Sequence, residues 1–155
     1  MPSPLLSREL NGILTEISLQ RFADAVFVLV TQVGKVGNLI QASLPATVPL
    51  QPSPPPDPLQ PNVLSLPPPP IALQLTPLLG HAPSEHMQTL HNIYASQIAT
   101  LVWTSEAESP LQVTRRNVIV GIALKKTAAT DQSELTEEER ETFSGVMSMV
   151  KEILV

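Results

Sequence analysis

Strand patterns dominate the sequence from Leu10 to Ala42: hydrophobic and polar residues alternate loosely over Leu10–Phe22 in the period of two that is typical of β-strands, and Ala25–Val33 is β-branched and apolar. The pattern predicts strands over Leu10–Phe22, Ala25–Val33 and Val36–Ala42. Gly34 and Lys35 separate the second strand from the third, and glycine at the first position of a two-residue loop suits a type II′ turn. We therefore expect the second and third strands to pair as a hairpin.

The second half of the chain combines strand patterns with the three- and four-residue spacing of helices. Apolar residues at helical spacing predict a helix over Met87–Trp103, with Ser84 as its N-cap. A final helix is predicted to begin at a capping box that starts at Thr136 and to run to the end of the chain. Strands are expected over Ile71–Thr76 and Val118–Leu124. This order indicates an α+β fold with one largely antiparallel sheet and two amphipathic helices.

Two of the predicted strands are apolar on both faces, which is typical of strands that are covered on both sides. Two helices can cover one face of such a sheet. Either the helices lie on opposite faces, or the bare face packs against another protein, and we favour the second arrangement because monomers rarely expose large apolar patches. The sequence thus predicts a dimer whose interface is a sheet face formed by Val26, Val28, Val30, Val118, Val120 and Ile122.

Proline interrupts the pattern between the third and fourth predicted strands. The chain contains 17 prolines, and a stretch from about residue 43 to residue 70 is too rich in them for a helix or a central strand. We expect a flexible loop with polyproline-II segments there. The remaining residues suffice for one hydrophobic core, so residues 1–155 are predicted to form a single domain.

Charge and composition exclude several functional classes. The formal net charge is −5, which disfavours nucleic-acid binding. The chain has no cysteine, which removes disulfides, thiolate nucleophiles and cysteine-based metal sites. No apolar run approaches the roughly 20 residues that span a bilayer, and the amino terminus does not resemble a secretion signal. We expect a soluble cytoplasmic protein that does not bind membranes, with entry into the nucleus left open.

Several short motifs are better explained by structure than by chemistry. The Gly34–Gly37 segment lacks the Ser or Thr and the following helix of a phosphate-binding loop. Acidic residues from Asp131 to Glu141 open the last helix, where they complement its dipole. The P-x-x-P matches lack a nearby cation and are interpreted as a spacer. Three histidines are spaced five residues apart, which does not place them on one helix face: His81, His86 and His91. No enzyme activity, cofactor or metal is predicted.

Basic residues at the ends of strands are the remaining candidates for partner contacts. Such charges are usually solvated, and they prevent the edge of a sheet from pairing with another chain. On the rim of a binding site they would accelerate association with a partner. The candidate partner-binding residues are Lys35, Arg115, Arg116, Lys125 and Lys126.

The segment Thr31–Ile40, with the apolar strand from Val26 before it, resembles the central hairpin of the proteasome assembly chaperone 3 family. Members of that family carry Thr-Gln at the end of a strand, then Gly-Lys, an apolar residue and a second glycine. Leu90–Val102, a polar loop and Val118–Lys126 are similar to the helix, loop and long apolar strand of the family. Together these segments cover about half the chain in the same order. The loop at residues 43–70 is longer and richer in proline than in the family.

The resemblance implies a non-enzymatic chaperone that pairs with a sibling, proteasome assembly chaperone 4, through the sheets of the two proteins. It also implies transient binding to proteasome α-subunits while they form the ring of the 20S particle. A homodimer of the isolated chain stays an open possibility. The alternative is a self-associating scaffold module of the longin or roadblock kind, which serves small GTPases or trafficking complexes and has a similar arrangement of one sheet and two helices.

Overall fold

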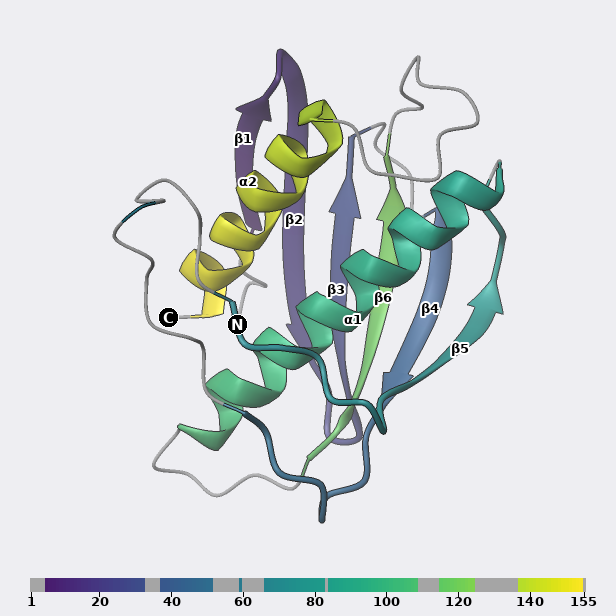
Figure 1. The fold of residues 1–155 in the computed structure, drawn as a ribbon, viewed down its shortest axis with the longest axis vertical. Helices are drawn as coiled ribbons and strands as arrows, with labels where there is room; N and C mark the ends of the chain where they lie inside the picture. The colour runs from purple at the N-terminus through teal and green to yellow at the C-terminus, as the bar shows by residue number, and fades with distance from the viewer. Residues whose placement is uncertain are drawn as a thin grey trace.

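The computed structural model describes residues 5–32, 37–51, 59, 66–82, 84–108, 115–124 and 137–154. Within these residues the chain forms six strands and two helices (Figure 1). The strands are β1 (Leu5–Leu10), β2 (Ile13–Arg21), β3 (Ala25–Thr31), β4 (Asn38–Ser43), β5 (Gln74–Leu79) and β6 (Asn117–Ala123). The helices are α1 (Glu85–Ala107) and α2 (Glu137–Leu154). Neither helix is long and apolar enough to cross a bilayer.

The strands form one sheet in the order β1-β2-β3-β6-β4-β5. Every neighbouring pair is antiparallel except β3 and β6, which are parallel. The predicted α+β class with a largely antiparallel sheet is therefore confirmed.

The sheet has a first strand that the sequence pattern did not separate from the second. Leu10 ends β1 and Ile13 begins β2, and the two residues between them, Asn11 and Gly12, have positive φ angles of 50° and 77°. Asn-Gly with positive φ at both positions is the signature of a type I′ hairpin. The prediction of one strand over Leu10–Phe22 was therefore wrong at its start, because residue 10 belongs to a separate strand.

The predicted hairpin between β3 and β4 is also wrong. Residues 33–36 lie outside the described part of the chain, but β6 lies between the two strands and pairs with both. Val120 of β6 is opposite Val28 of β3 on one side and Ile40 of β4 on the other. A strand that is apolar on both faces is most stable at the centre of a sheet, so the long-range pairing of β6 outweighs the local preference for a hairpin.

Glycine is required where β4 leaves the preceding loop. Gly37 has φ +70°, and a Cβ at this position would overlap the carbonyl oxygen of Ile122 in β6. Gly80, with φ +78°, follows β5 and would place its own Cβ 3.1 Å from the carbonyl oxygen of Gly37. The second glycine of the Gly-Lys-Val-Gly motif therefore serves the close approach of β4 to β6.

Both helices lie on the same face of the sheet (Figure 1). Helix α1 packs on β4, β5 and β6, and α2 packs on β1 and β2. The arrangement with one helix on each face is therefore wrong. The predicted N-cap is confirmed, because the Ser84 hydroxyl accepts a hydrogen bond of 3.2 Å from the Met87 amide. The capping box at Thr136 lies outside the described residues.

A contact between two polar side chains joins the amino-terminal ends of the two helices. His86 Nε2 in α1 lies 2.8 Å and 3.0 Å from the two carboxylate oxygens of Glu139 in α2, whose side chain is almost fully buried. Tyr94 packs edge-on against Phe143 with ring centroids 5.2 Å apart. Burial, together with the negative charge of Glu139, raises the pKa of Tyr94 above its ordinary value. Glu139 therefore fixes α2 to α1 in addition to complementing the helix dipole.

The ends of the proline-rich segment are packed on the domain. Pro67 is buried and its carbonyl oxygen accepts a 2.9 Å hydrogen bond from the buried side chain of Gln97 in α1. Arg115 donates hydrogen bonds to the carbonyl oxygens of Pro45 and Val48. The expectation of a flexible loop over residues 43–70 therefore needs correction at both ends, and most of its middle lies outside the described residues. The fourth predicted strand was expected to begin at Ile71, but β5 begins at Gln74 because a turn occupies the residues before it.

Candidate protein-interaction face

The sheet face opposite the helices is formed by every second residue of each strand. Because paired residues of neighbouring strands share a face, the strand registers define continuous rows across this face. One row crosses all six strands and is mainly apolar: Leu5, Ser18, Leu29, Gly121, Leu39 and Leu79. The neighbouring row has apolar residues at its centre and polar residues at its ends: Gln20, Phe27, Ile119, Gln41 and Thr76. We call these two rows the open face.

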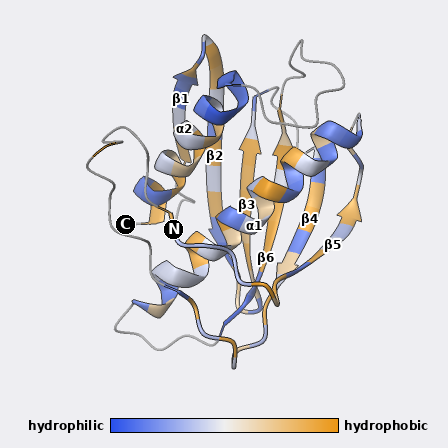
Figure 2. Ribbon diagram, in the orientation of Figure 1, coloured by the Kyte–Doolittle hydropathy of each residue, from blue (hydrophilic) through white to orange (hydrophobic). Residues whose placement is uncertain are grey.

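Large apolar side chains occupy the middle of the open face. Phe27, Leu29, Ile119 and Leu39 are half-buried, although they lie on the three central strands β3, β6 and β4. The patch continues to both edges of the sheet, where the side chains of Leu5 and Leu79 are 64% and 67% exposed. Figure 2 shows that β3 and β6 are hydrophobic along most of their length. A contiguous apolar patch of this kind, with a polar rim, is typical of protein interaction sites.

The six residues predicted for the interface lie on the other side of the sheet. They are buried to 1% exposure or less beneath the two helices, where they form the centre of the chain's own core: Val26, Val28, Val30, Val118, Val120 and Ile122. The prediction was correct that these strands are apolar on both faces, but the six residues belong to the chain's own core and are not exposed to a partner. An interface on this sheet must use the residues that alternate with these six.

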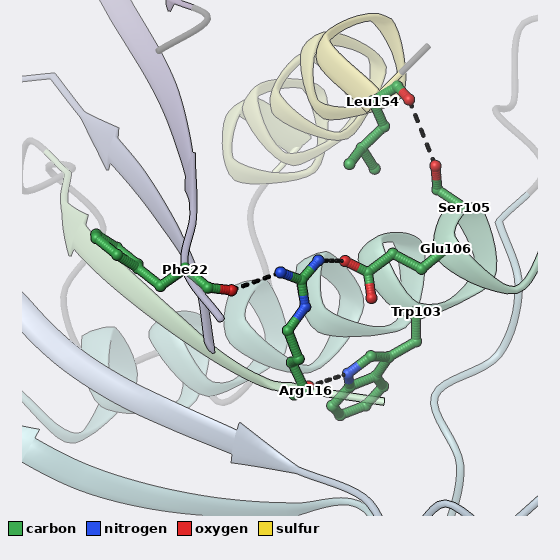
Figure 3. Close-up of polar contacts among 6 residues, drawn as sticks. All are labelled: Phe22, Trp103, Ser105, Glu106, Arg116 and Leu154. Atoms are coloured by element: carbon green, nitrogen blue, oxygen red, sulfur yellow. Dashed lines mark hydrogen bonds and ion pairs between the residues drawn. The ribbon is translucent and has the colours of Figure 1, made fainter. Parts of the chain in front are cut away.

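Arg116 is part of an internal polar network (Figure 3). Its guanidinium forms an ion pair with Glu106 of α1 and donates to the carbonyl oxygen of Phe22, directly after β2. Trp103 Nε1 donates a 2.7 Å hydrogen bond to the carbonyl oxygen of Arg116. The side chains of Arg116 and Glu106 are only 14% and 11% exposed. These contacts give Arg116 a structural role, contrary to the expectation that it binds a partner.

The other candidate basic residues divide into two groups. Arg115 is half-buried and binds the carbonyl oxygens of the proline-rich segment, so it also stabilises the chain internally. Lys35, Lys125 and Lys126 lie outside the described residues. The structure therefore brings none of the predicted basic residues to the open face within the described part of the chain.

Phe22 is a candidate contact residue that the sequence analysis missed. It lies in the tight turn between β2 and β3, and half of it (51%) is exposed. Its amide donates a 2.8 Å hydrogen bond to the carbonyl oxygen of Ala25, and its own carbonyl oxygen is held by Arg116. In Figure 3 the Phe22 ring points away from Arg116 and from α1. A rigid backbone that presents an exposed aromatic ring reduces the entropy cost of binding.

The three histidines lie in different environments. His81 is exposed in the loop before α1, and His86 contacts Glu139. His91 is only 3% exposed, and its Nδ1 atom lies 3.2 Å from the side-chain nitrogen of Asn38 in β4. Because that nitrogen is a donor, His91 Nδ1 accepts and the ring is neutral. Burial lowers the pKa of His91 to about 4.

The burial of His91 is expected to make the fold sensitive to acid. In the unfolded chain the pKa of His91 returns to about 6.5, so the unfolded state binds a proton between pH 6.5 and 4 that the folded state does not bind. Between pH 7.5 and pH 5 this residue should lower the free energy of unfolding by about 2 kcal/mol. Urea unfolding at both values will test this, and the variant His91→Gln should lose that part of the pH dependence. An unchanged pH dependence in the variant would contradict the assignment.

The fold and the open face together define a class: an α+β domain with two helices on one side of a six-stranded sheet and, on the other side, an apolar surface that neither described helix covers. No protein-family model matches the chain, and no curated protein matches it. Among solved structures, it is similar to a chain of a complex described as "a Novel Chaperone Complex for Yeast 20S Proteasome Assembly". The match covers 100% of both chains with a TM-score of 0.54 and 12% sequence identity. At this identity the similarity establishes a shared fold.

Proposed function

We propose that this protein is a non-enzymatic chaperone for the assembly of the 20S proteasome. It would pair with a sibling chain, similar to proteasome assembly chaperone 4, and the resulting heterodimer would bind α-subunits transiently while they form a ring. The observation that carries the proposal is the open face, which has an apolar centre and no helix from the described part of the chain above it.

The open face supports the pairing step in particular. Apolar area at the centre of an interface provides the driving force for association, and polar residues at its rim set the orientation. Here Phe27 and Ile119 are adjacent at the centre, while Gln20 and Gln41 flank them. A second sheet packed face to face would bury this row in the manner of a β-sandwich, in which two sheets lie about 10 Å apart.

The fold similarity supports the assembly role. The yeast chain with the same fold comes from a chaperone complex for 20S proteasome assembly, and the match extends over the whole of both chains. The resemblance of Thr31–Ile40 to the proteasome assembly chaperone 3 family points independently to the same function. Transient binding of α-subunits would require contacts outside the open face, because the sibling would occupy that surface.

Affinity purification of the tagged chain from cells tests the proposal. We expect mass spectrometry to identify a sibling chain and proteasome α-subunits, and to find the chain absent from mature 20S particles that are purified in parallel. The matched control is the same tagged chain with Ile119→Asp, which should lose the sibling. Recovery of a small GTPase, or of copies of the chain alone, would instead favour a scaffold of the longin or roadblock kind.

A further inference from the structure

A pocket of about 510 Å³ lies between the two helices and the proline-rich segment, on the helix side of the sheet. It is lined by residues from the last two turns of α1 and the last turn of α2, by the cap residue Glu108 and by Pro67. Leu101, Leu154 and Pro67 provide apolar walls. Pockets of this size with apolar walls and a few polar groups are typical of binding sites.

The carboxyl-terminal ends of both helices make this pocket electronegative. A helix end carries a partial negative charge from its unpaired carbonyl groups. Helix α1 has no basic residue in its last turn, and Glu108, directly after it, makes no ion pair with any described residue. Lys151 in the last turn of α2 is the one cation among the described residues that line the pocket. Among the described lining residues, the two helix ends and the Glu108 carboxylate outweigh the single ammonium group of Lys151, so this part of the pocket has a net negative charge.

The hydroxyl groups in the pocket are suited to accept hydrogen bonds. Thr104 already donates its hydroxyl hydrogen to the carbonyl oxygen of Thr100 at 2.7 Å, and Ser105 donates to the carbonyl oxygen of Leu154 at 3.4 Å. The oxygen of each hydroxyl keeps its acceptor capacity. Together with the Glu108 carboxylate, the pocket therefore offers acceptors around an apolar floor, and a ligand that fits it must bring donors and a positive charge.

We propose that this pocket binds an arginine side chain carried by a segment of a partner protein. The three methylene groups of arginine would lie against Leu101, Leu154 and Pro67, and the guanidinium would donate to Glu108 and the two hydroxyl oxygens. Arginine fits better than lysine, since its guanidinium is weakly hydrated and presents five donors in a planar fork. The pocket and the open face lie on opposite sides of the sheet, so both can be occupied together. The proposal does not depend on the proposed chaperone function.

Titration with two short peptides tests the inference on the full chain. The probe is acetyl-Ala-Leu-Arg-Leu-Ala-amide, and its matched control replaces arginine by citrulline, which has the same shape without the charge. We expect the arginine peptide to shift the backbone amide signals of Thr104, Ser105 and Lys151 in NMR spectra, with an affinity that falls as salt is added. The citrulline peptide should bind at least about fivefold more weakly, as expected for the loss of one partly exposed ion pair.

Two pairs of variants separate the pocket from general electrostatics. Glu108→Lys should weaken binding of the arginine peptide by about fivefold or more, while Glu141→Lys, an equal charge change at an exposed site on α2, should have little effect. Lys151→Met removes the pocket's own cation and keeps its apolar stem, so it should strengthen binding about threefold. Its control is Arg140→Met, an equal loss of charge at another exposed position of α2.

Four results would overturn the inference. The first is equal binding of the arginine and citrulline peptides. The second is equal weakening by Glu108→Lys and Glu141→Lys, which would show that only net charge matters. The third is a set of shifted NMR signals on the open face and none around the pocket. Absence of binding by either peptide at millimolar concentration would also count against it. None of these results would affect the pairing test through Ile119, so failure here is distinguishable from failure of the chaperone proposal.

Discussion

Replacing Ile119 by aspartate is expected to abolish pairing of the chain with the proposed sibling and to leave the fold intact. Ile119 is half-buried at the centre of the open face, between Phe27 and Gln41 on the neighbouring strands. In the free chain an aspartate there remains in contact with water, but in the paired state it would be buried without a counter-charge. That costs about 3 kcal/mol or more, which corresponds to a loss in affinity of more than about a hundredfold.

The adjacent residue provides the matched control. Val120 is fully buried beneath the helices, so Val120→Asp places the same carboxylate in the core and should destabilise the fold by about 4 kcal/mol or more. Sedimentation of each variant with the sibling measures pairing, and thermal unfolding followed by circular dichroism measures stability. If Ile119→Asp paired normally, or if it unfolded like Val120→Asp, the open face would not be the interface.

Replacing Gly37 by alanine is expected to cost about 3 kcal/mol or more of folding stability. Two effects combine at this position: a positive φ of +70°, which is strained for alanine, and a Cβ that would overlap the Ile122 carbonyl oxygen. Relief of the overlap requires β4 to move away from β6, which would weaken the hydrogen bonds of the central pair. Urea unfolding will show the loss as a lower midpoint with an unchanged slope.

Gly12 separates the two effects. It has a φ of +77°, similar to that of Gly37, but nothing lies within 4 Å of the Cβ that alanine would add. Gly12→Ala should therefore show the backbone strain alone, about 1 kcal/mol. Equal losses in the two variants would mean that the close approach of β4 to β6 contributes nothing to stability.

The local patterns in the sequence predicted most elements of this fold. The helical spacing and the Ser84 cap place the start of α1 correctly, and the apolar run at Val118–Leu124 coincides with β6 to within one residue. These features depend on interactions within a few residues of each other, so they are readable from the sequence. The Asn11-Gly12 turn is equally local, and attention to that dipeptide would have separated β1 from β2.

Strand order and strand orientation could not be read in the same way. The Gly34-Lys35 pair predicted that β3 and β4 are neighbours, but the strand beside β3 at that position is β6, whose paired residues lie 92 positions later in the sequence. Val120 and Ile119 are both apolar, so hydrophobicity alone did not show which of them faces the helices. Gln20 and Gln41 lie opposite Phe27 and Ile119 on neighbouring strands, and these polar residues mark the less buried face of the sheet. They could have identified that face from the sequence only if the strand register had been known.

The roles of the basic residues were likewise set by long-range contacts. Arg116 follows a polar connection in the sequence, which suggested a solvated strand end. In the fold its guanidinium meets Glu106 from α1 and the carbonyl oxygen of Phe22. No local pattern links these three residues, since Phe22 is 94 positions away along the chain.

The position of β6 has a consequence for how the protein is made. Synthesis proceeds from the amino terminus, so β1, β2 and β3 leave the ribosome as one unit and β4 and β5 as another. The two units cannot join until β6 emerges, because it supplies the hydrogen bonds to both. Until then β3 and β4 each have an unpaired apolar edge, which is a hazard for aggregation. A newly made chain is thus expected to need general chaperones until β6 has emerged, and slowing translation just before residue 117 should increase its aggregation.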